Sequence, residues 1–187
     1  MLYVSKGFKL KKKIKGKHII YHFGSKYMLD KEELEIWKNG LGIFASPMTN
    51  REMDIVIRLK EKGLVETSEG TTPRDRFFLL NKCIVRVLKR RGHVFFYPPI
   101  VKEIWQWLNY KGERLSLIDV IYLKENKISP TPELLKKGNE KELMHILHPC
   151  PITIGNERTL KMAVAFCRDD VVQAFMFLVR KGKIYLI

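Results

Sequence analysis

The sequence predicts an α+β fold, and two observations carry this prediction. The first thirty residues alternate apolar and polar side chains, whereas several later segments repeat apolar residues at helical spacing. The chain of 187 residues is 45% hydrophobic, which supplies enough apolar surface for one large or two small domains. We expect two domains, at residues 1–88 and residues 89–187.

The N-terminal segment is expected to form strands. Leu2 to Phe8 and Lys17 to Phe23 alternate well enough for a β-hairpin, with Gly16 near its turn and lysines facing water. A short strand at Lys26 to Leu29 follows. The first domain should therefore open with a lysine-rich hairpin.

Two helices come next, each with a start and a stop signal. Asp30 and Glu33 form a capping box, and the helix should end at Gly40 or Gly42. Thr49 or Asn50 caps the second helix, and its apolar positions include Met53, Val56, Ile57 and Leu59. Gly63 should stop this helix before a short strand at Leu64 to Glu66.

The residues after this strand suggest a family. Thr67 to Arg76 has the composition of a polar turn, and Phe77 to Leu88 resumes a run of apolar and β-branched residues typical of a strand. Helix, strand, polar turn and returning strand resemble the winged helix-turn-helix superfamily over roughly residues 30–84. This resemblance implies that the second helix can enter a DNA groove and that the polar turn is a wing that contacts backbone.

Two stretches of similar sequence predict that the C-terminal half repeats this scheme. Lys102 to Trp105 matches Leu34 to Trp37, and Val171 to Ile187 matches Glu52 to Ser68 without gaps. Between these stretches Glu133 to Leu147 predicts an added helix. We expect that the second unit is winged-helix-like with a helical insertion. The alternative is that the similarity reflects only a common way of ending a helix, with Lys-Gly before a strand.

Charge and cysteine content restrict the class of protein. Residues 1–29 hold eight lysines and no acid, and residues 70–92 hold seven basic residues against Asp75, so these segments supply +8 and +6 of the net +15. A polyanion is the expected partner, and a basic surface that serves only solubility is the alternative. Three cysteines without a Cys-x-x-Cys pair, no continuous apolar span and no secretory signal predict a cytoplasmic protein without a membrane span.

The candidate nucleic-acid-binding residues lie in four places. Arg51 and Arg58 could reach base edges from the second helix, although Glu52, Asp54 and Glu61 share that helix and an ordinary solvated face explains it equally well. The remaining candidates contact phosphates from the basic arm, the wing and the join between the units. The full set is Lys11, Lys12, Lys13, Lys15, Lys17, Asn50, Arg51, Arg58, Arg74, Arg76, Lys89, Arg90 and Arg91.

Other chemistry is less well supported. Phe95, Phe96, Tyr97, Trp105 and Trp107 could stack unpaired bases, but burial of a helix stripe is the favoured interpretation. His145, His148 and Cys150, with Cys167 further on, could hold zinc, yet their spacing matches no standard module. No catalytic motif is present, so we predict no enzyme, no cofactor and no metal.

Two functions follow as hypotheses. The first is a DNA-binding regulatory protein that holds the phosphate backbone of double-stranded DNA through its arm and wing. A homodimer would match a two-fold site. The second is a protein- or peptide-binding adaptor without catalytic activity. Ile19 to Asp30 followed by Glu33 to Trp37 is similar to the small winged-helix peptide-binding domains found with peptide-modifying enzymes, in which a peptide adds to a sheet edge.

Overall fold

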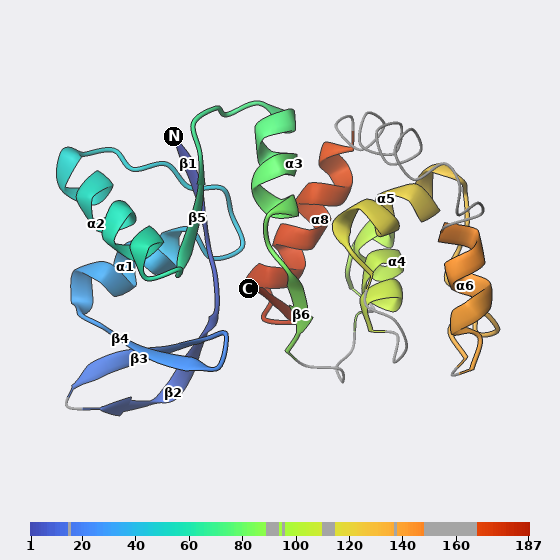
Figure 1. Ribbon diagram of the computed structural model, residues 1–187, viewed down its shortest axis with the longest axis horizontal. Coiled ribbons are helices and arrows are strands. Elements are labelled where there is room, and N and C mark those ends of the chain that lie inside the picture. Colours follow the sequence, from blue (N-terminus) through green and yellow to red (C-terminus); the bar gives the residue numbers. More distant parts are fainter. Residues whose placement is uncertain (15, 89–93, 95, 110–114, 137, 148–167) are drawn as a thin grey trace.

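The structure, a computed structural model, describes the chain except residues 15, 89–93, 95, 110–114, 137 and 148–167 (Figure 1). It confirms the α+β class, with helices packed around small antiparallel sheets. The described elements are β1 (Leu2–Ser5), β2 (Phe8–Ile14), β3 (Lys17–His22), β4 (Ser25–Leu29), α1 (Lys31–Asn39), α2 (Asn50–Glu61), β5 (Val65–Ser68), α3 (Pro73–Asn81), β6 (Val85–Val87), α4 (Pro99–Leu108), α5 (Leu117–Glu125), α6 (Glu140–Leu147), α8 (Asp169–Arg180) and β7 (Ile184–Leu186).

The N-terminal core forms where α1 and α2 pack against the β1–β5 pair and one face of β3. β1 pairs antiparallel with β5, from Leu2 opposite Ser68 to Ser5 opposite Val65. The hairpin expected between Leu2 to Phe8 and Lys17 to Phe23 is therefore wrong in its first strand. β1 is buried along its whole length, so its partner is decided by the core and not by the nearest turn.

The second sheet is a three-stranded meander in the order β2-β3-β4. β2 pairs with β3 across a turn that contains Gly16, as predicted for Gly16, and β3 pairs with β4 across Phe23 and Gly24. Ile20 lies on the face that α1 covers, in one hydrophobic cluster with Leu34 and Trp37. The meander thus projects from the N-terminal core with its outer strands at the protein surface (Figure 1).

The predicted Asp30–Glu33 capping box is present, and Thr49, one of the two caps expected for the second helix, forms a capping box with Glu52. The Asp30 side chain accepts from the Glu33 N–H at 2.8 Å, and the Thr49 hydroxyl accepts from the Glu52 N–H at 3.1 Å. These bonds satisfy amide groups that the first helical turn leaves without partners. The helices accordingly begin at Lys31 and Asn50, as the sequence predicts.

The C-terminal core lies between α3, α4, α5, α6 and α8, with α8 at its centre (Figure 1). Seven of the twelve residues of α8 are buried, which explains why its sequence is apolar on nearly every side. Among the described residues, no helix has both the length and the apolar character that crossing a membrane requires. The added helix predicted for Glu133 to Leu147 is shorter than expected, because α6 begins only at Glu140.

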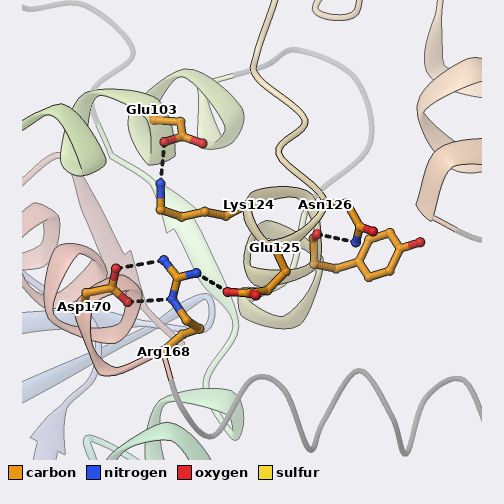
Figure 2. Close-up of polar contacts among 7 residues, drawn as sticks. Glu103, Lys124, Glu125, Asn126, Arg168 and Asp170 are labelled. Carbon is orange, nitrogen blue, oxygen red and sulfur yellow. Dashed lines mark hydrogen bonds and ion pairs between the residues drawn. The ribbon is translucent and has the colours of Figure 1, made fainter.

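A polar clamp joins three of these helices (Figure 2). Arg168, which precedes α8, bonds both carboxylate oxygens of Asp170 at 2.9 and 2.8 Å and also reaches Glu125 at the end of α5. Lys124 in turn donates to Glu103 of α4 at 2.8 Å. The hydrogen bonds from Arg168 hold the pKa of Asp170 below its ordinary value. This clamp fixes the start of α8 against α5.

The segments β1–β5 and β6–β7 both begin and end with strands that pair with each other, and in both a twelve-residue helix precedes the last strand. α2 and α8 are both twelve residues long, and each ends in Lys-Gly with a left-handed glycine, at φ +71° for Gly63 and +61° for Gly182. β1 pairs with β5 and β6 pairs with β7, both antiparallel. In both units the residue after the first strand donates its N–H across the pair at 2.8 Å, from Lys6 to Leu64 and from Leu88 to Lys183. The matching sequence stretches thus adopt matching backbone geometry.

The returning strand predicted for the wing is largely wrong. Residues 73–81 form α3, which starts at a Thr72 cap with Pro73 in its first turn, and only Val85–Val87 is a strand. The domain boundary after residue 88 stays a prediction. The described packing places α3 in the C-terminal core and pairs β6 with β7.

Candidate functional site

The meander has two edge strands, and they differ in what they offer a partner. Among the described residues, β2 and β4 each pair with β3 alone. Phe23 and Gly24 form a two-residue turn, so the flanking pair His22 and Ser25 exchange hydrogen bonds and the pairs alternate from there. The N–H and C=O groups of Lys26 and Met28 consequently point away from β3.

The outer edge of β4 is open. Leu29 is buried and Tyr27 packs against the N-terminal core, which fixes the strand. Lys26 is exposed, and Met28 has 52% of its surface exposed. An ordered strand with outward backbone groups and an exposed apolar side chain is a template for pairing with another chain.

The outer edge of β2 carries a row of lysines instead. Lys9, Lys11, Lys12 and Lys13 are all exposed, and the pairing register shifts between Lys9 and Lys13. Charged side chains and bulges are the common means of keeping an edge strand from pairing with other chains. Lys17 is exposed at the start of β3, and Lys15 lies outside the described residues.

A cationic pocket lies between this lysine row and α1. It has a volume of about 470 Å³ and is lined by His18, Lys31, Leu34, Glu35, Lys38 and Asn39. Lys9 and Lys13 pair with Ile20 and His18 in the sheet, so they share the face of His18. Desolvation and then the charges of Lys9, Lys13 and Lys38 hold the pKa of His18 below its ordinary value. This face has a positive potential.

Helix α2, from which we expected contacts to base edges, has few of the predicted cations without an ion pair among the described residues. Asn50, Arg51 and Arg58 are exposed on α2, as expected. However, the Arg51 guanidinium pairs with Glu32 of α1, and this hydrogen bond raises the pKa of Arg51. Arg58 is therefore the one member of this set that has both a charge and no ion pair among the described residues.

The expected wing cations lie on a helix. Arg74 and Arg76 are in the first turn of α3, where the Arg74 guanidinium lies over the Phe78 ring at 5.6 Å. Arg76 donates to both carboxylate oxygens of Asp169 at 3.0 and 3.1 Å. The interpretation of these two arginines as a wing tip is wrong. Figure 1 shows α3 beside α8 and away from β2, which lies at the lower left of the view.

Some of the other candidates lie outside the described residues. These are Lys89, Arg90, Arg91, Phe95, His148, Cys150 and Cys167. Of the proposed stacking residues, Trp105 and Trp107 are buried, and Tyr97 packs edge-on against Phe177 at 5.2 Å between ring centroids. Phe96 is fully exposed. Burial, the favoured interpretation, holds for both tryptophans.

Nucleophilic and metal chemistry find little support in the part of the chain that the structure describes. Burial raises the pKa of the Cys83 thiol to about 12, so the reactive thiolate is disfavoured at neutral pH. No group of three or more His, Cys, Asp or Glu residues there could hold a metal ion. His145 is exposed on α6.

Comparison of the chain with protein-family models, curated proteins and solved structures gave no match. The functional assignment therefore depends on the geometry of the chain itself. Sequence analysis missed Met28 and also missed Arg86, a residue of β6. The Phe23-Gly24 pair between two alternating segments was the available signal, because it predicts the hairpin that makes β4 an edge strand.

Proposed function

We propose that the chain is a non-catalytic binding module that captures a peptide as an added strand beside β4. The observation that carries this proposal is the difference between the two edges of the meander. Lys26 and Met28 direct backbone donors and acceptors outward from β4, whereas lysines and a register shift protect β2. Strand addition of this kind takes its affinity from main-chain hydrogen bonds and its specificity from alternate side chains.

The charge of the meander selects an acidic peptide. Residues 1–29 carry eight lysines and no acid, and Lys26 lies on the open strand itself. Met28, on the same face of β4, offers an apolar contact beside it. The partner is thus an extended segment with acidic residues and an apolar residue opposite Met28. The similarity to peptide-binding winged-helix domains supports the same function.

A proline at position 28 tests the edge directly. The N–H of Met28 points away from β3, so Met28→Pro removes an outward donor without removing a bond to β3, and proline is tolerated at such edge positions. We expect Met28→Pro to weaken peptide binding at least tenfold, which is about 1.4 kcal/mol. Fluorescence anisotropy with linear peptides selected from a random display library on the wild-type protein measures this effect.

Lys13→Pro is the matched control on the opposite edge. Lys13 is the next residue in from the flanking pair Ile14 and Lys17, so its N–H also points away from β3. Circular dichroism should show both variants folded. Peptides that bind Met28→Pro as tightly as wild type, or that lose affinity only with Lys13→Pro, would place the partner elsewhere.

The second candidate function is nucleic-acid binding along the lysine face. The observation that favours it is the placement of Lys9 and Lys13 on the face of His18, which lines one pocket with Lys38. Desolvation first, and then the charges of these three lysines, lower the pKa of His18. A phosphate backbone that follows β2 would meet these groups and the exposed Lys11, Lys12 and Lys17. In this proposal the contacts come from the meander and not from α3.

A salt series distinguishes the two candidates. If the lysine face binds mixed-sequence duplex DNA, affinity falls steeply with salt, and Lys9→Ala/Lys13→Ala/Lys38→Ala reduces the slope of log K against log salt by about 2–3. Arg74→Ala/Arg76→Ala should leave that slope unchanged, because Arg76 is already paired with Asp169. Equal losses from both sets, measured by anisotropy, would contradict a localised lysine surface. Peptide held by backbone bonds should respond much less to salt.

A further inference from the structure

A second pocket lies where the β3–β4 hairpin meets the β6–β7 pair. Its volume is about 250 Å³, and its lining residues are Tyr21, Phe23, Gly24, Arg86, Tyr185 and Ile187. This volume is below the range of roughly 300–1,000 Å³ typical of small-molecule sites, so it suits one side chain. The pocket opens next to Ser25, where the open strand β4 begins.

The walls of this pocket are held by ring packing. The Phe8 ring lies 5.3 Å from the Tyr21 ring and 4.9 Å from the Tyr185 ring, between ring centroids. Phe8 therefore joins the meander to β7. Tyr21 pairs with Lys26 across β3 and β4, which places Lys26 on the pocket's face of the sheet.

Arg86 supplies the cationic group of this pocket. Its side chain is half-buried, and its Nε atom is enclosed without a hydrogen-bond partner in the part of the chain that the structure describes. Among the described residues no carboxylate pairs with Arg86, whereas Arg51 and Arg76 each pair with one and Arg168 pairs with two. An enclosed guanidinium N–H is a strong donor, and leaving it unpaired is costly.

Phe23 forms the rim of the pocket in an unusual conformation. Its φ is +45°, a left-handed value that bulky residues rarely adopt, and 72% of its surface is exposed. Asparagine, aspartate or glycine is the usual residue at this position of such a turn. An aromatic side chain held there can close over a group that enters the pocket.

We propose that this pocket receives an aspartate or glutamate side chain of the peptide bound at β4, with Arg86 as its partner. The inference rests on the proposed peptide-binding function. A strand that pairs along β4 rises about 3.3 Å per residue. It therefore reaches the pocket within a residue or two of the hairpin tip, and the carboxylate lies between two tyrosine rings beside the guanidinium.

A double-mutant cycle tests the assignment with the peptides selected on the wild-type protein. Replacing the pocket-binding glutamate of the peptide by glutamine should weaken binding to the wild type about tenfold, but binding to Arg86→Gln less than about twofold. Arg58→Gln removes an equal charge from an exposed position on α2 and serves as the control. A glutamate preference that survives in Arg86→Gln, or that disappears equally in Arg58→Gln, overturns the assignment.

A second measurement does not depend on finding a peptide. N-acetylglutamate amide should shift the Arg86 Nε–H resonance in ¹⁵N NMR spectra, whereas N-acetylglutamine amide should not. If the Arg86 resonance shifts but no selected peptide depends on the β4 edge, the result would support a pocket for acidic groups and reject strand addition. Peptides that lose binding with Met28→Pro, together with no shift at Arg86, would support the edge and reject the pocket.

Discussion

Gly42→Ala is expected to lower the free energy of unfolding by more than about 3 kcal/mol. Gly42 has a φ of +74°, which costs an alanine roughly 1–2 kcal/mol. The added Cβ would also lie 2.4 Å from the backbone nitrogen and 2.6 Å from the Cα of Arg180. These are backbone atoms of α8, so the contact can be relieved only by moving the Gly42 loop away from the C-terminal core.

Gly16→Ala provides the matched control for this prediction. Gly16 has almost the same φ, +76°, but an added Cβ there would meet nothing within 4 Å. Urea unfolding of both variants separates backbone strain from the clash. Equal losses would show that the Gly42 loop does not need its close contact with α8.

Trp37→Ala should cost about 3–5 kcal/mol, the typical range for removing a buried tryptophan. Trp37 is 1% exposed in the N-terminal core, and its Nε1 donates to the Lys6 carbonyl at 2.9 Å. The Ser5 hydroxyl donates to the Trp37 carbonyl at 2.6 Å. This residue thus ties α1 to the end of β1, beside the point where the meander leaves the core.

Phenylalanine at two positions separates the hydrogen bond from the packing. Trp107 is equally buried, but its Nε1 has no hydrogen-bond partner among the described residues. We therefore expect Trp37→Phe to cost about 1–3 kcal/mol more than Trp107→Phe, because only the first leaves a carbonyl without its donor. Thermal and urea unfolding measure the difference. A larger loss from Trp107→Phe would show that volume alone decides the cost.

The error at the predicted wing strand has a physical origin. α3 carries buried residues at Phe77, Leu79 and Leu80 because it packs between the two cores, so its apolar pattern does not show the one-sided spacing of a surface helix. The Thr72-Asp75 capping box was the local signal for a helix here. Because this segment was predicted as a turn and a strand, Arg74 and Arg76 were expected at the tip of a wing and not in a helix.

The candidate site also contains features that the sequence predicted and features that it did not. The basic arm at Lys11 to Lys17 was predicted, but the strand β2 that carries most of it was not, because the expected first strand was Leu2 to Phe8. The open edge at Met28 and the position of Arg86 in a pocket were also not predicted. Each depends on which strands pair, and the sequence alone does not state that β6 pairs with a strand almost one hundred residues further on.

The sequence by itself determined the starts and ends of α1 and α2 and the fold class, because caps, glycine stops and apolar period act within a few residues. Only the tertiary structure decided that β1 pairs with β5, that Arg76 forms an ion pair with Asp169, and that β4 is an edge strand among the described residues. These outcomes depend on burial shared between distant segments, where free energy is gained from contacts that local chemistry does not encode.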